Sequence, residues 1–116
     1  MEPKPRFIHG VYAYEGKGLE APFPLDARAT YTVPRDKRAQ LIYLRGGNSG
    51  SELVYLVLMR DERPLRYFPI GAKASIHVPL AVVEDLFPES KLDVFVAAPK
   101  GAAGAVVIDF GLIEVD

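Results

Sequence analysis

Short runs of β-branched, aromatic and other apolar residues recur along this chain at intervals of roughly 8–14 residues, with turn-forming residues between them. Two of these runs, 38–45 and 52–60, are joined by the polar, glycine-rich stretch 46–51. Side chains of this kind suit a pleated, half-buried surface. We interpret the two runs as adjacent antiparallel strands in the middle of the fold.

The rest of the chain continues this pattern. A two-residue link at 61–62 predicts a tight hairpin turn. Pro64 suits an edge strand because proline has no N–H to donate, and Gly111 inside the last run predicts a bulge or bend. Further strands are expected at 7–14, 29–33, 63–68, 74–78, 91–97 and 105–115.

Two segments interrupt the strand pattern. Residues 80–86 are the only candidate helix, of one or two turns, because Pro79 suits a helix start and a second proline soon follows. The segment 15–28 is rich in glycine and proline. It is expected either to wrap an edge and bury Phe23 and Leu25 or to form a functional loop.

About eight short strands with at most one short helix predict an all-β fold, an antiparallel two-sheet β-sandwich of immunoglobulin-like architecture. The 116 residues are expected to form a single domain, 1–116, in which residues 1–6 are a mobile tail. The chain contains neither cysteine nor tryptophan. Two marks of antibody domains are therefore absent, and the prediction concerns the architecture only.

Composition excludes several classes of function. With 14 basic and 15 acidic residues, the net charge of -1 gives no general attraction to nucleic acid or anionic membranes. The longest apolar run, 53–59, is far shorter than the ~20 residues that cross a bilayer. The absence of cysteine excludes disulfides and thiolate sites, and no secretory signal is recognisable, so we expect a soluble cytoplasmic protein.

Candidate catalytic and metal-binding groups are few. His9 and His77 with carboxylates such as Glu15, Glu84 or Asp85 offer the ligand types of a divalent-metal site, but their spacing does not indicate convergence. We therefore expect no metal or other cofactor. No catalytic motif is present, so an enzyme is not expected, with an unidentified activity that uses His9 or His77 as the alternative.

Two short motifs have no functional meaning here. The stretch 46–51 resembles a phosphate-binding loop only in its glycines, because it lacks the Gly-Lys-Ser/Thr ending and a following helix. The triplet Asp109-Phe110-Gly111 matches a kinase motif by chance in a chain far too short for that fold.

Arginine and tyrosine are the most suggestive surface residues, since both anchor interfaces and bind acidic groups or sugars. They are interpreted as solvated strand ends, as an interface with a partner or second subunit, or as an anionic-ligand site. In 53–59 we interpret Val54, Leu56 and Leu58 as outward-facing, which gives more apolar surface than a solvated sheet needs. A central strand covered on both faces would show the same pattern. The wider basic and aromatic set is Arg35, Lys37, Arg38, Arg63 and the six expected interface residues Arg45, Tyr43, Tyr55, Arg60, Arg66 and Tyr67.

The sequence therefore favours a non-catalytic protein-interaction or assembly module that is homo-oligomeric. The alternative is a small-ligand-binding domain, for a sugar or acidic metabolite, in which the loops 15–28 and 46–51 gather at one end of the sandwich.

Overall fold

The computed structural model describes residues 3–116, without the side chains of residues 81–83. Within that range the chain forms nine strands and no helix. None of the described elements is a helix long and apolar enough to cross a membrane. The strands are β1 (Lys4–Glu15), β2 (Phe23–Pro24), β3 (Thr30–Thr32), β4 (Arg38–Asn48), β5 (Val54–Arg60), β6 (Arg63–Ile70), β7 (Ser75–Leu86), β8 (Lys91–Ala97) and β9 (Ala103–Val115).

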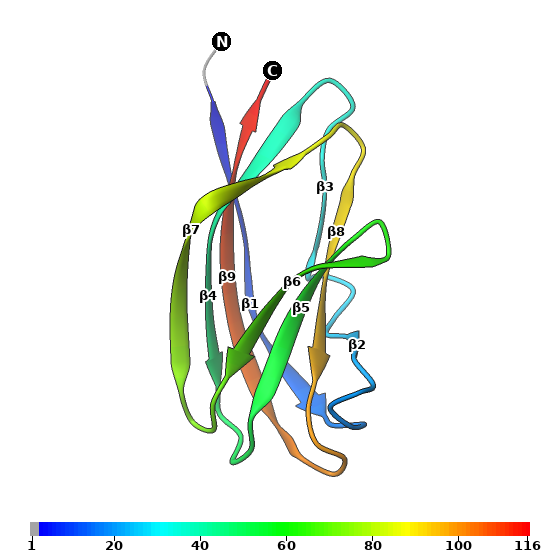
Figure 1. Cartoon of the computed structure of the whole chain (residues 1–116), viewed down its shortest axis with the longest axis vertical. Helices are drawn as coiled ribbons and strands as arrows, with labels where there is room; N and C mark the ends of the chain where they lie inside the picture. The colour runs from blue at the N-terminus through cyan, green and yellow to red at the C-terminus, as the bar shows by residue number, and fades with distance from the viewer. Residues whose placement is uncertain (1–2) are drawn as a thin grey trace.

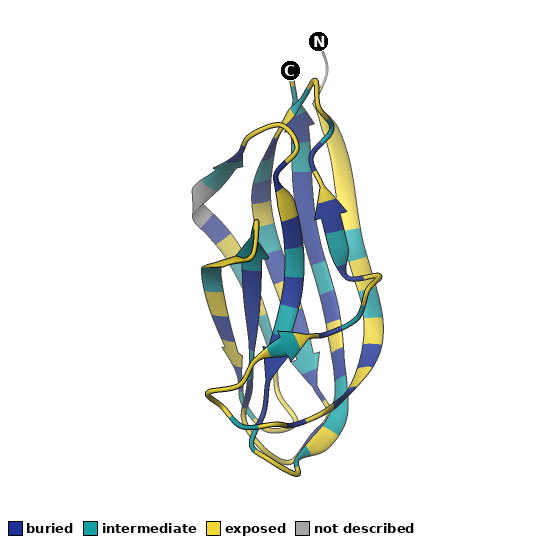
Figure 2. Cartoon of the chain, turned by 90° about the vertical axis from the view of Figure 1, so that its right-hand side faces the viewer, coloured by how far each residue is buried: buried dark blue, intermediate teal, exposed yellow. Residues whose placement is uncertain are grey.

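The strands form two antiparallel sheets packed face to face along a molecule 47 Å long (Figure 1). Sheet A has the order β1-β9-β4-β7, and sheet B has the order β2-β8-β5-β6, with β3 also paired to β8. Buried and exposed residues alternate along the strands (Figure 2). The prediction of an all-β, antiparallel two-sheet sandwich is thus confirmed, while its immunoglobulin-like topology stays a prediction.

The predicted pairing of the two middle strands is wrong. β4 belongs to sheet A and β5 to sheet B, so the link between them carries the chain from one sheet to the other. Asn48 organises this crossing, because its buried side-chain amide donates to the Glu52 carbonyl at 2.8 Å while its oxygen accepts from the Gly50 N–H at 2.9 Å. The apolar runs predicted the strands but not which strands pair, because pairing is decided by contacts between segments distant in sequence.

The predicted helix at 80–86 is also wrong, because these residues continue β7 along β4. Leu86 lies opposite Ala39, and Glu84 lies opposite Leu41. Pro79 stays within the strand because β7 is an edge of sheet A, where a missing N–H need not break a ladder. A proline at a helix start and a proline on an edge strand look alike in sequence.

The sequence predicted an edge-wrapping segment or a functional loop at 15–28, a tight turn at 61–62 and an irregularity at Gly111. The segment 15–28 does wrap an edge: Leu25 is buried, its N–H donates to the Val94 carbonyl at 2.9 Å, and Phe23 pairs with β8. β6 is an edge strand that follows a two-residue turn with positive φ at residues 61 and 62, as predicted. The irregularity expected at Gly111 lies instead in the neighbouring strand β4, between Leu41 and Tyr43.

The outward orientation expected for Val54, Leu56 and Leu58 is wrong, since all three are fully buried in the core between the sheets. The opposite face of β5 carries Tyr55 and Met59, which are half-buried. The alternation of side chains separated the two faces of β5 correctly, but the prediction placed the wrong face in the core.

Buried polar contacts join the two sheets at one end of the sandwich. The Tyr31 hydroxyl on β3 donates to Glu114 on β9 at 2.6 Å, and the Arg6 guanidinium donates to the same carboxylate at 3.2 Å. Glu114 is only 3% exposed. Burial first, and this hydrogen bond second, raise the pKa of Tyr31 well above its usual range, so the phenol stays a donor.

The prediction of a mobile tail at residues 1–6 is wrong for residues 4–6. Residues 4–6 are not a free segment: they belong to β1 and pair with residues 112–114 of β9. Residues 1–2 lie outside the described residues.

Replacing Tyr31 by Phe should lower the free energy of unfolding by about 1–3 kcal/mol, because a buried carboxylate loses one of its donors. Tyr67→Phe is the matched control: Tyr67 is 59% exposed, and its loss of a hydroxyl should change stability by less than about 0.5 kcal/mol. Denaturant unfolding of the three proteins measures both values. Equal stability of Tyr31→Phe and the parent would show that the contact does not hold the sheets together.

Candidate functional site

A polar row crosses the outer face of sheet A. His9 on β1 lies opposite Asp109 on β9, Asp109 lies opposite Arg45 on β4, and Arg45 lies opposite His77 on β7. Directly opposite residues of antiparallel strands project from the same face. The four side chains therefore form one line from edge to edge of the sheet.

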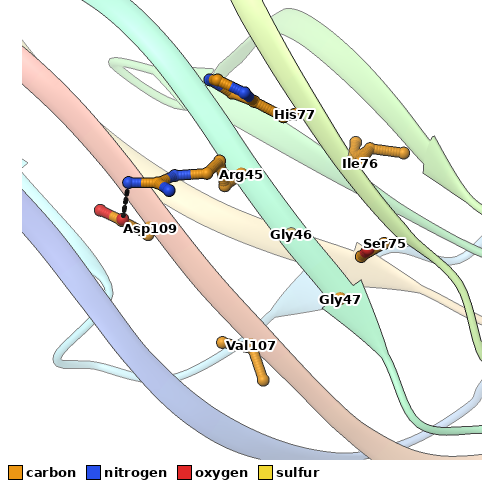
Figure 3. A pocket seen from close by; sticks show the side chains of 8 residues that line it. All are labelled: Arg45, Gly46, Gly47, Ser75, Ile76, His77, Val107 and Asp109. Carbon is orange, nitrogen blue, oxygen red and sulfur yellow. Dashed lines mark ion pairs between the residues drawn. The ribbon is translucent and has the colours of Figure 1, made fainter.

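Asp109 is the best-satisfied member of this row. Its carboxylate accepts a hydrogen bond from the Tyr43 hydroxyl at 3.0 Å and forms an ion pair with the Arg45 guanidinium at 3.1 Å (Figure 3). The guanidinium also lies 5.2 Å from the centre of the Tyr43 ring, and His77 meets that ring edge-on. Each of its two carboxylate oxygens thus has a partner within β4.

Gly111 makes this arrangement possible. A Cβ atom at Gly111 would lie 2.3 Å from the Tyr43 ring, so only glycine leaves the ring in its place beside β9. The irregularity of β4 next to Tyr43 lies at the same level of the sheet.

An open hollow of about 630 Å³ adjoins the row on the same face. Its floor is the backbone of β4 at Gly46 and Gly47, and its sides come from β7 and β9 (Figure 3). A Cβ atom at Gly47 would meet no heavy atom closer than 3.9 Å, so the missing side chain opens this space. The lining residues are Arg45, Gly46, Gly47, Ser75, Ile76, His77, Val107 and Asp109.

Apolar side chains gather on the same face beside the hollow. Val11 on β1 lies directly opposite Val107 on β9, and Phe7 lies four residues from Val11 on the same face, with His9 between them. Val11 is 66% exposed, Val107 is 49% exposed and Phe7 is 57% exposed. We call Phe7, Val11 and Val107 the β1–β9 patch. Sequence reasoning did not single it out, although the alternation of 7–14 already placed Phe7 and Val11 on one face.

The structure distributes the six expected interface residues over several surfaces. Tyr43 and Arg45 lie on the outer face of sheet A, whereas Tyr55 and Tyr67 stack at 5.8 Å on the outer face of sheet B. Arg60 lies opposite Arg63 at the β5–β6 turn and lines a second, smaller hollow of about 420 Å³. Arg66 pairs with Glu84 across the open side of the sandwich at 3.3 Å.

The other candidate residues do not form a recognisable site. His9 and His77 are exposed and separated by the two middle strands of sheet A. Among the described residues there is no cluster of three groups that would hold a metal ion. Gly16 and Gly50 both contact residues 98–104, so the loops 15–28 and 46–51 do approach the same end, but the two hollows described above lie elsewhere.

Comparisons with known proteins give a likeness of fold. No protein-family model matches the sequence, and no curated protein does. Nine chains among solved structures match. One of them, from a structure of infectious bursal disease virus (Gt strain), is 11% identical with a TM-score of 0.51. The match covers 97% of this chain and 32% of the viral one, so this chain spans about a third of that length. At this identity the likeness concerns the fold alone.

A double-mutant cycle on Arg45 and Asp109 should give a coupling energy of about 0.2–1 kcal/mol, because the pair is solvent-accessible and screened. The same cycle on Arg45 and Asp93, which lie on different sheets, should give no coupling. Denaturant unfolding of the single and double alanine variants measures both values. A coupling above about 2 kcal/mol would mean that the row is a structural element instead of an accessible surface feature.

Proposed function

We propose that this protein is a non-catalytic contact module that associates with a second copy of itself through the β1 side of sheet A. The observation that carries the proposal is the β1–β9 patch, in which Val11 and Val107 are exposed neighbours and Phe7 is exposed on the same face beyond His9. Scattered exposed apolar residues are ordinary, but adjacent ones favour a contact surface. The immunoglobulin-like topology and a cytoplasmic location belong to the same proposal.

The polar row supports a role in contact over a role in catalysis. Tyrosine and arginine beside an apolar patch are residue types enriched in protein interfaces. Asp109 accepts from Tyr43 and pairs with Arg45, so the interface-type residues of the row are held in place by one carboxylate. Tyr43 and Arg45 are the two members of the expected interface set that adjoin the patch.

A small anionic ligand in the hollow at Gly47 is the second candidate function. Its support is the open space beside a guanidinium, Arg45, with the Ser75 hydroxyl in the lining. Arg45 is paired with Asp109 at 3.1 Å, however, and this pairing offsets its attraction for an added anion. Self-association is therefore the better supported of the two.

The test is the molar mass in solution, compared with 12.8 kDa for one chain. The molar mass measured by light scattering should approach twice the mass of one chain as the protein concentration increases. Val11→Asp should raise the dissociation constant at least about tenfold, or about 1.4 kcal/mol, because association would desolvate the new carboxylate.

Tyr67→Asp places the same charge on a 59% exposed residue of sheet B and is the control, for which the parent mass is expected. A parent protein that stays at the mass of one chain at millimolar concentration would refute self-association. If only Tyr67→Asp lowers the measured molar mass, the contact between the two copies lies on sheet B and not on sheet A.

A further inference from the structure

The edges of the two sheets differ in how they are protected against pairing. Beside β8, the edge strands β2 and β3 have only two and three residues, and β2 ends in Pro24. The edge strand β6 contains Pro64 and Pro69, and β7 contains Pro79. Short edge strands and prolines hinder strand addition. β1 is the exception: it has 12 residues, and its one proline, Pro5, is the second of them.

The hydrogen-bond pattern shows which groups of β1 are open. The register continues past the strand end, where the Gly16 N–H donates to the Ala102 carbonyl at 2.6 Å. Bonded positions alternate in antiparallel pairs, so even-numbered residues of β1 bond to β9, and odd-numbered ones direct N–H and C=O away from it. Pro5 fits this pattern, because its missing N–H would not have faced β9. The open positions are Phe7, His9, Val11 and Ala13.

These open groups coincide with the exposed side of the strand. The side chains of all four residues are exposed on the outer face of sheet A, and β1 descends from the N label in Figure 2. Within the described chain, no backbone hydrogen bond from a turn or loop ends on any of the four. β1 therefore offers a row of main-chain donors and acceptors next to the β1–β9 patch.

We propose that the open edge of β1 pairs antiparallel with β1 of a second copy, which joins the two A sheets into one continuous sheet. This inference rests on the proposed self-association and names its mode. Pairing of identical strands around a two-fold axis is self-complementary, and it satisfies the open main-chain groups of both copies at once.

Charge and side-chain pairing both fit a second copy in antiparallel orientation. β1 begins with Lys4 and ends with Glu15, and neither forms an ion pair within the described residues. Antiparallel pairing brings the basic end of each strand toward the acidic end of the other, whereas parallel pairing would align like charges. With His9 on the two-fold axis, Phe7 of each copy lies opposite Val11 of the other, so these exposed apolar side chains become cross-strand neighbours on one face.

Residue-resolved amide hydrogen exchange tests the pairing. In the dimeric parent protein, the amides of residues 7, 9 and 13 should exchange at least about tenfold more slowly than in Val11→Asp. The amides of Ile8 and Tyr12, which bond to β9, should be protected in both proteins. Fast exchange at 7, 9 and 13 in a parent that light scattering shows to be dimeric would overturn strand pairing and leave self-association intact. A monomeric parent would overturn both.

Two proline variants test the same edge by mass. Val11→Pro keeps an apolar side chain and removes an N–H that faces the open edge, so it should abolish the dimer. Tyr67→Pro is the matched control on β6, the edge strand of sheet B, and should leave the dimer intact. The N–H of residue 67 also points outward, because Pro69 occupies the next position of the same alternation. Circular dichroism should report a native fold in both. A Val11→Pro protein that folds and stays dimeric would contradict the pairing, and if it does not fold, the exchange measurement decides.

Discussion

The burial of alternate side chains between two facing sheets is the constraint on which the rest of the structure depends. Phe110 of β9 and Leu44 of β4 belong to one side of this core, and Leu56 of β5 and Val94 of β8 belong to the other. A strand that gives every second residue to the core must show the others to solvent or to a partner. The outer surface is therefore as strictly determined as the interior, and the polar row and the β1–β9 patch follow directly from it.

Two buried polar contacts secure the register that alternation requires. Glu114 accepts from Tyr31 across the sheets, and near the other end of the core Asn48 accepts from the Tyr14 hydroxyl at 2.8 Å. Burial raises the pKa of both tyrosines, so each remains a neutral donor. A slip of one residue in β9 would expose Val106 and Ile108 and would also break the Glu114 contact. The outer face of sheet A is presented by a frame that tolerates little rearrangement.

Sequence patterns identified the strands better than their partners. The strand at 91–97 and the turn at 61–62 were predicted, because each depends on neighbours in sequence. The burial of Leu25 against β8 was one of two alternatives for the segment 15–28. β4 and β5 lie in different sheets, and the strand at 80–86 lies at a sheet edge. Both placements are tertiary effects. Tyr43 and Arg45 were anticipated as surface residues. Their partner Asp109 and the β1–β9 patch became visible only once the register was known.

Concentration-dependent NMR spectra of the parent protein test the role of sheet A most directly, because they need no substitution. On dilution from millimolar to micromolar concentration, backbone amide shifts should change along β1 and around Val107. Those around Tyr55 and Tyr67 on sheet B should stay constant. Spectra without any concentration dependence, or changes confined to sheet B, would contradict the account.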